Sequence, residues 1–255
     1  MDIGILKEKK SMKPLSEFKN IHNGKRVFII GNGPSLTGVD LDLLDGEYSI
    51  AMNRISRVYS STRWRPSFFV CTTSNIEDPS WRVDILDTVR LGIPTFVWEE
   101  LEEHFDGIRN VYPLKCLNGH EVTDNAPMEW WSDDIESHVT KFGTSMIVAF
   151  QLVVYMGFKE IVLLGADLGF KDSVLQKIFY RVGLKQLGHN FDSNHFFGSY
   201  GTPGFPASVL NSNMLAAHRL TKKACDARGV RVYNASPETK LNLYPRVNLR
   251  LLFDR

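Results

Sequence analysis

Cysteine is scarce in this sequence, and long hydrophobic runs are missing. Its 255 residues include three cysteines, Cys71, Cys116 and Cys225, which are odd in number and far apart. This pattern fits neither a disulfide framework nor a zinc site and is typical of a reducing compartment. No apolar stretch approaches the length of a transmembrane helix, and residues 1–25 contain no apolar core of a secretion signal. We therefore expect a cytoplasmic protein without a transmembrane segment.

Net charge is also nearly absent. Thirty Lys and Arg residues face 29 Asp and Glu residues, which leaves a formal charge of +1. Such a balance gives no general attraction to nucleic acid or to an anionic membrane, so we expect no nucleic-acid partner. A hydrophobic content of 43% and a charged content of 23% are ordinary for a globular enzyme or binding protein.

The most informative stretch is Arg26–Leu36, with the sequence Arg-Val-Phe-Ile-Ile-Gly-Asn-Gly-Pro-Ser-Leu. Val27–Ile30 predicts a strand buried on both faces, and Gly31-Asn32-Gly33 predicts a sharp turn that can approach a ligand. Ser35 is the expected N-cap of a following helix, whose N-terminus would suit a phosphate. Leu36 replaces the third glycine of the dinucleotide fingerprint, and there is no Walker lysine. A tight turn without a ligand is the alternative.

Polar side chains follow several other expected strands. Asn53 follows a strand at Tyr48–Met52, Thr72 follows one at Ser67–Cys71, and Asp167 follows one at Lys159–Leu164. The carboxyl ends of parallel strands are where ligands bind in open α/β sheets, so these side chains could contact a base or a ribose. Capping of loops is the alternative, because Asn, Ser and Thr favour the ends of strands and helices.

Helices are expected between the strands. They are predicted at Pro79–Leu91, Gly143–Gly157 and Pro206–Arg228, with Thr144 or Ser145 starting the second. Strands alternating with helices predict a doubly wound α/β fold with a mostly parallel sheet. The further strands are expected at Thr95–Trp98, Val111–Leu114 and Arg231–Tyr233.

Three segments interrupt this rhythm. Asn118–Ser137 is polar around Trp130-Trp131 and is predicted to be a loop or lid, in which the tryptophans stack on a sugar or cover a hydrophobic edge. Residues 168–205 are rich in aromatic residues and contain His189 and His195, which is typical of a functional lid. The tail, Leu241–Arg255, could be an edge strand, a dimer contact or a surface anchor.

These motifs, in this order, resemble a known group. Ile29–Leu36, Asn53, Thr144-Ser145, Gly157–Ile161 with Leu164–Asp167, and Asp192–Phe196 together resemble the bacterial sialyltransferases of glycosyltransferase family 42. They also resemble the broader MptE-like (6-hydroxymethylpterin pyrophosphokinase-like) group, often linked to surface polysaccharides such as lipopolysaccharide and capsule. The resemblance implies a single Rossmann-like domain at residues 26–255, with a lid at about 168–205, after a lead-in at 1–25.

The resemblance also implies a function. It predicts a metal-independent glycosyltransferase without a cofactor, which moves a sialic acid-like or Kdo-like sugar from a CMP donor to a glycan acceptor. His195 would be the general base, because a histidine can accept a proton near neutral pH. The nucleotide would be bound by Gly31, Asn32, Gly33, Ser35, Asn53, Thr72, Ser145 and Asp167. Gly169 replaces the tyrosine that holds the leaving phosphate in that family, and Tyr180 or Tyr200 could take its place.

Two other functions stay open. A Mg²⁺- and ATP-dependent pterin pyrophosphokinase would need acidic metal ligands, for which Asp167, Asp172 and Asp192 are the candidates. A non-catalytic nucleotide-binding protein of polysaccharide assembly is the third reading. The sequence leaves open whether the chain forms a homo-oligomer and whether its tail touches the inner face of the membrane.

Overall fold

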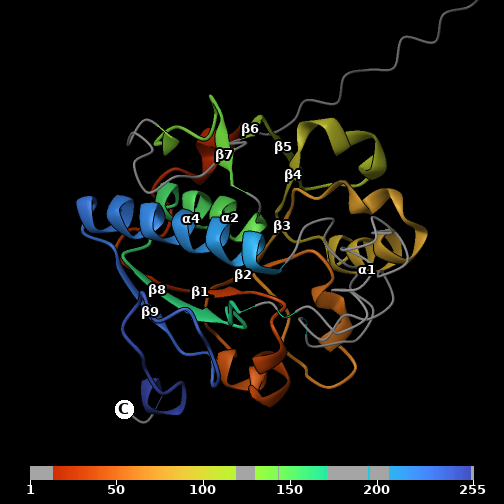
Figure 1. Cartoon of the computed structure of the whole chain (residues 1–255). Helices are drawn as coiled ribbons and strands as arrows, with labels where there is room; N and C mark the ends of the chain where they lie inside the picture. Colours follow the sequence, from red (N-terminus) through yellow and green to blue (C-terminus); the bar gives the residue numbers. More distant parts are fainter. Residues whose placement is uncertain are drawn as a thin grey trace, which may run out of the picture.

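The computed structural model describes residues 14–118, 130–142, 144–169, 171, 195 and 207–253. Its centre is a seven-stranded sheet with the order β5-β4-β3-β2-β1-β8-β9, in which every neighbouring pair is parallel. Figure 1 shows helices on both faces of this sheet, so the predicted doubly wound α/β fold is confirmed. The strands are β1 (Arg26–Ile30), β2 (Ser49–Met52), β3 (Phe68–Cys71), β4 (Thr95–Trp98), β5 (Val111–Leu114), β8 (Glu160–Leu164) and β9 (Arg231–Asn234).

Among the described residues, three α-helices and several 3₁₀ helices cover the sheet. α2 (Ser145–Tyr155) and α4 (Ala207–Ala227) lie side by side on one face, and α1 (Pro79–Val89) packs on the other. The 3₁₀ helices are η1 (Leu15–Phe18), η2 (Pro34–Gly38), η3 (Leu41–Leu44), η4 (Ile55–Val58), η5 (Ser74–Glu77), η6 (Glu99–Phe105) and η9 (Arg250–Leu252).

The central strand β1 shows why the two layers form. Val27 and Ile29 point into the cluster beneath α2 and α4, and Phe28 and Ile30 point into the cluster beneath η2, η3 and α1. All four side chains are fully buried. Successive side chains of a strand face opposite sides, so an unbroken apolar run must be covered on both.

Helix α2 is almost wholly internal. Thr144 caps it by accepting a hydrogen bond from the Met146 amide at 3.3 Å, and ten of its eleven residues are buried. Gly157 ends the helical segment at a φ of +91°, a conformation that other residues rarely adopt. The helix predicted over Gly143–Gly157 is therefore present with Thr144 as its N-cap.

The segment around the paired tryptophans differs from the prediction. Trp130 and Trp131 belong to the core on the α2 face, so their assignment to a loop or lid outside the core was wrong. A second, two-stranded parallel sheet of β6 (Cys116–Asn118) and β7 (Val139–Lys141) flanks them and was not predicted. Covering a hydrophobic edge, the alternative use of these side chains, is the one observed.

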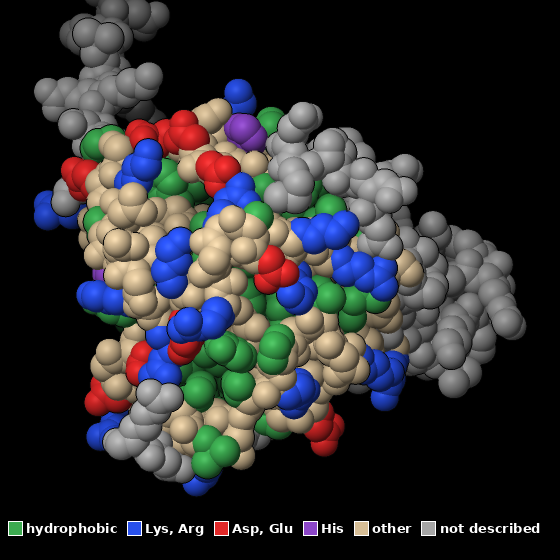
Figure 2. Space-filling model, turned by 90° about the vertical axis from the view of Figure 1, so that its left-hand side faces the viewer, with side chains coloured by type: hydrophobic (Ala, Val, Ile, Leu, Met, Phe, Trp, Pro, Cys, Tyr) green, Lys and Arg blue, Asp and Glu red, His purple; other side chains and the backbone are tan. Residues whose placement is uncertain are grey.

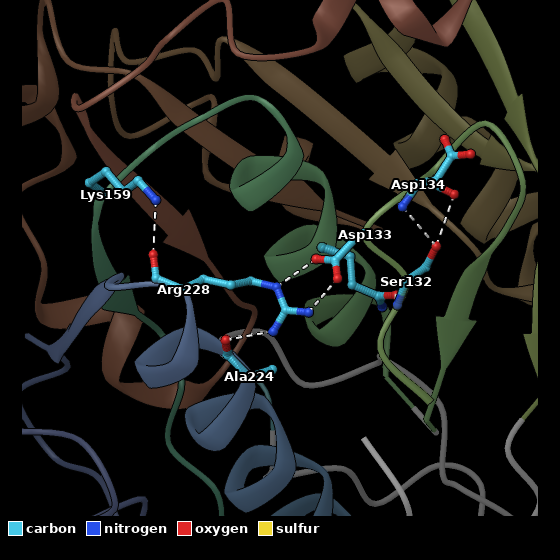
Figure 3. Close-up of polar contacts among 7 residues, drawn as sticks. Ser132, Asp133, Asp134, Lys159, Ala224 and Arg228 are labelled. Carbon is cyan, nitrogen blue, oxygen red and sulfur yellow. Dashed lines mark hydrogen bonds and ion pairs between the residues drawn. The ribbon is translucent and has the colours of Figure 1, made fainter. Parts of the chain in front are cut away.

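A charged clamp fixes this segment to the end of α4 (Figure 3). Arg228 donates from Nε and Nη2 to the two carboxylate oxygens of Asp133, at 2.5 and 2.6 Å. Its guanidinium lies 5.2 Å from the Trp131 ring centroid and also donates to the Ala224 carbonyl. The bidentate pair and the ring contact therefore hold Trp131 against the helix.

Both ends of the described chain pack on the domain. Phe18 lies edge-on to Phe96 and Tyr112 in the core, so the lead-in contributes to the domain from this point on. In the tail, Tyr244 is buried, and the Phe253 ring stacks at 6.1 Å from that of Phe28. A single bridge joins Asn234 to Arg246, so the tail pairs with the sheet at one point rather than as a full edge strand.

Neither the surface charges nor the cysteine thiols of the described residues indicate a second functional site. Figure 2 shows Lys and Arg side chains dispersed over one side of the molecule among uncharged ones. Cys71, Cys116 and Cys225 are buried, and burial raises the pKa of each thiol to about 12. Within the described residues, no helix combines the length and apolar character needed to cross a membrane.

Candidate active site

A cavity of about 910 Å³ opens at the carboxyl ends of β1, β2, β8 and β9. The chain runs from β1 outward to β5 and then returns to β8 on the other side of β1, so the strand order reverses between β1 and β8. The crevice at such a reversal is where open α/β sheets bind ligands. The described residues along its wall include Gly31–Ser35, Asn53, Gly165–Gly169, His195, His218 and Pro237–Leu241.

The glycines at the base of the cavity bring two loops together. The Gly31 amide donates to the Leu164 carbonyl at 2.8 Å, and the Gly33 amide donates to the Gly165 carbonyl at 2.9 Å. A Cβ on Gly31 would lie 2.5 Å from the Gly165 oxygen, and Gly165 itself has a φ of +61°. The close approach that the glycines allow is therefore between the ends of β1 and β8.

The Asp167 side chain, which comes from the loop after β8, lies against the start of η2, the short helix that follows the glycine turn. Its Oδ2 accepts a hydrogen bond from the Ser35 amide at 2.7 Å, and its Oδ1 accepts one from the Ser35 hydroxyl. Burial nevertheless raises the pKa of the Asp167 carboxyl, against the lowering effect of both Ser35 bonds. The expected N-cap was wrong, because Gly33 precedes the five-residue 3₁₀ helix η2 and Ser35 lies inside it.

This arrangement changes where a phosphate could bind. The Ser35 amide already has an acceptor, and the carboxylate that fills its place would repel a second anion. η2 is also too short to offer the N-terminus of an α-helix. The turn of Gly31, Asn32, Gly33 and Ser35 thus lines the cavity, but it does not present the predicted phosphate cradle.

Asn53 is held at the cavity in a strained conformation. Its φ is +54°, in the left-handed region, where Asn is among the residues most often found. The next residue, Arg54, is 1% exposed and donates from Nε to Asp84 on α1 at 2.5 Å. Asn32 closes the other side by donating from Nδ2 to the Met52 carbonyl at 3.0 Å. A buried ion pair therefore fixes the backbone beside Asn53.

Thr72 and Ser145 lie behind Asn53 and not on the described wall of the cavity. The Ser145 hydroxyl donates to Asn53 Oδ1 at 3.3 Å, so it accepts from the Thr72 hydroxyl at 2.9 Å. The Thr72 carbonyl in turn accepts from Lys141 Nζ, and burial lowers the pKa of that ammonium. This chain of bonds orients the Asn53 amide, so both hydroxyls have a positioning role in the structure.

His195 lines the cavity. The structure thus brings it to the same space as the turn at Gly31, Asn53 and Asp167, although it comes from a distant part of the sequence. Tyr180 and Tyr200, the predicted phosphate contacts, lie outside the described residues, as do Asp172, His189 and Asp192.

The sequence reasoning missed a charged part of the wall beside Asp167, whose carbonyl accepts a hydrogen bond from the Lys240 amide at 2.7 Å. Lys171, Lys240 and Arg246 line it with Glu238, and the aliphatic stem of Lys240 packs over Gly169. Arg246 is anchored by donating from Nη2 to the carbonyls of Ser236 and Pro237, at 2.5 and 3.1 Å. Lys240 and Arg246 follow the last strand, at the carboxyl edge of the sheet where ligands bind, but nothing in the sequence of the tail itself marks them as facing a cavity.

Comparison with known proteins identifies one family and several solved structures with a similar fold. The family model of the 6-hydroxymethylpterin diphosphokinase MptE-like proteins matches residues 4–173. A search of curated proteins finds no match.

Among solved structures, the MAF glycosyltransferase of Magnetospirillum magneticum AMB-1 is similar over 92% of this chain and 37% of its own, with a TM-score of 0.55 and 16% identity. The present chain thus spans little more than a third of that protein. The sialyltransferase CstII of Campylobacter jejuni, in complex with cytidine-5′-monophosphate, is similar over 90% of this chain and 87% of its own, with a TM-score of 0.49 and 17% identity. The α-2,3-sialyltransferase Cst-I from the same organism reaches a TM-score of 0.44 at 13% identity, covering 87% of this chain and 79% of its own.

Proposed function

The chain belongs to the 6-hydroxymethylpterin diphosphokinase MptE-like family, and from that premise we propose that it is a glycosyltransferase. It transfers an acidic, sialic acid-like or Kdo-like sugar from a CMP-linked donor to a hydroxyl of a glycan acceptor. The observation that carries the proposal is the large cavity at the strand-order reversal, which is lined by the half-buried Asp167 carboxylate and, next to it, by a cationic wall of Lys171, Lys240 and Arg246. The proposed setting is surface-polysaccharide assembly in the cytoplasm.

The charges of the cavity suit a donor of this kind. Lys171, Lys240 and Arg246 supply three cations, and Asp167 and Glu238, which line the cavity beside them, supply two anions. A phosphate of the donor would therefore lie toward Lys240 and Arg246 rather than on the turn at Ser35, whose amide is already engaged by Asp167. The amide of Asn53 would face the base or the ribose.

His195 is the proposed general base. It would accept the proton of the acceptor hydroxyl while the oxygen attacks the anomeric carbon of the donor sugar. The bond between that carbon and the phosphate oxygen breaks, and the electron pair leaves with CMP. Lys240 and Arg246 would stabilise the charge that develops on the leaving phosphate.

The experiment compares His195→Ala with the wild type. Transfer from a CMP-linked sugar should fall by about 10² to 10⁴-fold, the usual contribution of a general base, while CMP still raises the melting temperature. His104→Ala, a change on η6 outside the described cavity wall, is the control and should keep full activity. Near-normal transfer by His195→Ala would refute the assignment.

The family description favours a second candidate, an ATP- and Mg²⁺-dependent pterin diphosphokinase. Of its three proposed carboxylates only Asp167 is described, and Ser35 engages both of its oxygens. Among the described residues no three His, Cys, Asp or Glu side chains gather in a metal-binding group, so this part of the chain does not by itself fit the ion.

A ligand panel separates the two candidates. Thermal shifts with CMP, CDP, UDP, GDP and ATP should show stabilisation by CMP, and transfer should persist in EDTA. Stabilisation by ATP alone, with activity strictly dependent on Mg²⁺, would favour the diphosphokinase. Binding of CMP without any transfer would favour a non-catalytic nucleotide-binding protein.

A further inference from the structure

His218 lines the cavity and is buried. Neither the sequence reasoning nor the proposed chemistry gives it a role. His218 comes from the middle of α4, and its residue is 5% exposed, yet it lines the cavity together with Met214 one turn earlier. Phe150 of α2 and Tyr244 of the tail meet its ring edge-on, at centroid distances of 6.2 and 5.7 Å. The imidazole is therefore held between two packed aromatic rings.

The hydrogen bonds of Tyr244 determine which ring nitrogen carries the proton. The Tyr244 hydroxyl donates its one hydrogen to the His218 carbonyl, at 3.1 Å. The same oxygen lies 3.1 Å from His218 Nδ1, and both contacts are hydrogen bonds at the same time only if the oxygen accepts there. Nδ1 must then carry the hydrogen, and in a neutral ring this leaves Nε2 as an acceptor.

The charge of the ring follows from its surroundings. Burial lowers the pKa of His218 to about 4, so the ring is neutral near pH 7. The titratable group that packs directly against it is the Tyr244 phenol, and burial raises the pKa of that phenol well above 10, so the phenol also stays uncharged. No hydrogen bond to Nε2 is found among the described residues, although the side chain lines the cavity.

We propose that His218 is a specificity-determining residue, whose Nε2 accepts a hydrogen bond from a hydroxyl of the bound sugar nucleotide. This inference rests on the proposed function for the identity of the ligand. A buried acceptor that is never protonated at neutral pH selects a ligand with a donor at that place, because a ligand without one would leave the nitrogen unpaired. The two histidines thus have different roles: His195 accepts a proton in the reaction, and His218 accepts a hydrogen bond from a ligand hydroxyl and keeps its own protonation state.

The test is nitrogen NMR of the histidine rings in the full chain. Long-range ¹H–¹⁵N spectra should show His218 with its proton on Nδ1 in the free protein. Saturating CMP, or CMP-linked sialic acid, should then shift the Nε2 resonance. A shift with both ligands assigns the hydroxyl to the nucleotide, and a shift with the second alone assigns it to the sugar.

A variant that keeps the ring gives an independent measurement. Tyr244→Phe removes the hydroxyl that fixes the tautomer, so Nε2 can become a donor, and ligand affinity should fall roughly tenfold, the equivalent of about one hydrogen bond. Tyr233→Phe, on β9, is the control and should bind normally.

The outcomes are distinct from those of the proposed function. A proton on Nε2 in the free protein would overturn the assignment whatever ligand binds. So would an Nε2 resonance that stays unchanged when CMP-linked sialic acid saturates the protein. Failure of every nucleotide to bind would refute the proposed function, and the tautomer of the free protein would still decide whether His218 presents an acceptor.

Discussion

At the scale of single residues, the cavity depends on groups that do not touch it. Arg54 is the clearest case, because its fully buried guanidinium pairs with Asp84 and lies 5.2 Å from the Trp81 ring centroid. Arg57 adds a second, more exposed contact to the same Asp84 oxygen at 3.0 Å. These interactions hold the end of β2, from which Asn53 projects into the cavity.

Removing the anion of this pair should be costly. Asp84→Ala leaves the buried Arg54 charge without its partner, and we expect the free energy of unfolding to fall by about 3 to 5 kcal/mol in urea titrations. Asp87→Ala on the same helix breaks an exposed ion pair with Arg90 and should cost about 1 kcal/mol or less. Equal losses for the two variants would mean that the buried pair contributes no more than a surface one.

Asp167 predicts a pH dependence of stability. Its pKa is raised in the folded state, so its contribution to stability is fully present below the ordinary carboxyl pKa of 3.8 and is lost as the pH rises through the folded-state value. Asp167→Asn cannot ionise, and an amide can still accept from the Ser35 amide. Its stability relative to the wild type should therefore improve as the pH rises from 3 to 7, in thermal melts over this range. A relative stability that falls over the same interval would show that the Asp167 pKa is lowered instead.

The sequence indicated part of this network. Asn32, Asn53 and Asp167 were recognisable because each follows a buried strand, where the sheet geometry gathers polar groups. The Ser35–Asp167 pair was not foreseeable, because it joins residues 132 positions apart. Lys240 and His218 were missed because a basic residue in a tail and a histidine on an amphipathic helix give no local signal of facing a cavity.

At the scale of elements, the junction of β1 and β8 determines the floor of the site. Each strand is followed by a glycine, Gly31 or Gly165, and the two backbones approach so closely that neither position has room for a Cβ. The sequence predicted both strands and the sharp turn, since β-branched runs followed by glycine are distinctive. It could not show that the glycines serve contact between backbones rather than contact with a ligand.

Gly165→Ala tests this junction. The new Cβ would lie 2.6 Å from the Gly31 carbonyl oxygen, in addition to the strain at a φ of +61°. Gly24→Ala is the matched control, because its φ is +78° but nothing lies within 4 Å of the Cβ position. We expect Gly165→Ala to lower the free energy of unfolding by about 1 to 3 kcal/mol more than Gly24→Ala. Equal losses in chemical denaturation would show that the junction can relax.

The helices were the easiest elements to predict, and the paired tryptophans the hardest. α2 is marked by an almost wholly apolar run between a capping threonine and a glycine. Trp130 and Trp131 sit in a polar stretch, and the contacts around them come from distant residues, among them Arg228, which pairs with Asp133, and Gln151. The Gln151 amide accepts from the Thr140 amide at 3.0 Å and donates to the Thr140 carbonyl at 2.8 Å. Such tertiary contacts outweigh local polarity.

At the scale of the whole molecule, the order of the strands explains where the site lies. The chain leaves β1 in one direction and returns on its other side, so two loops diverge above the sheet and leave a crevice between them. α4 and the tail close one side with His218, Lys240 and Arg246, and His195 approaches from the 168–205 insertion. The fold class could be derived from alternating strands and helices, but the cationic wall required the structure.

The most direct measurement is a crystal structure of the protein soaked with CMP. The account predicts that the nucleotide lies in the cavity between the ends of β1 and β8, with its phosphate toward Lys240 and Arg246 and its base or ribose near Asn53. A cavity that takes up ATP but not CMP, or CMP bound at another place on the molecule, would contradict it.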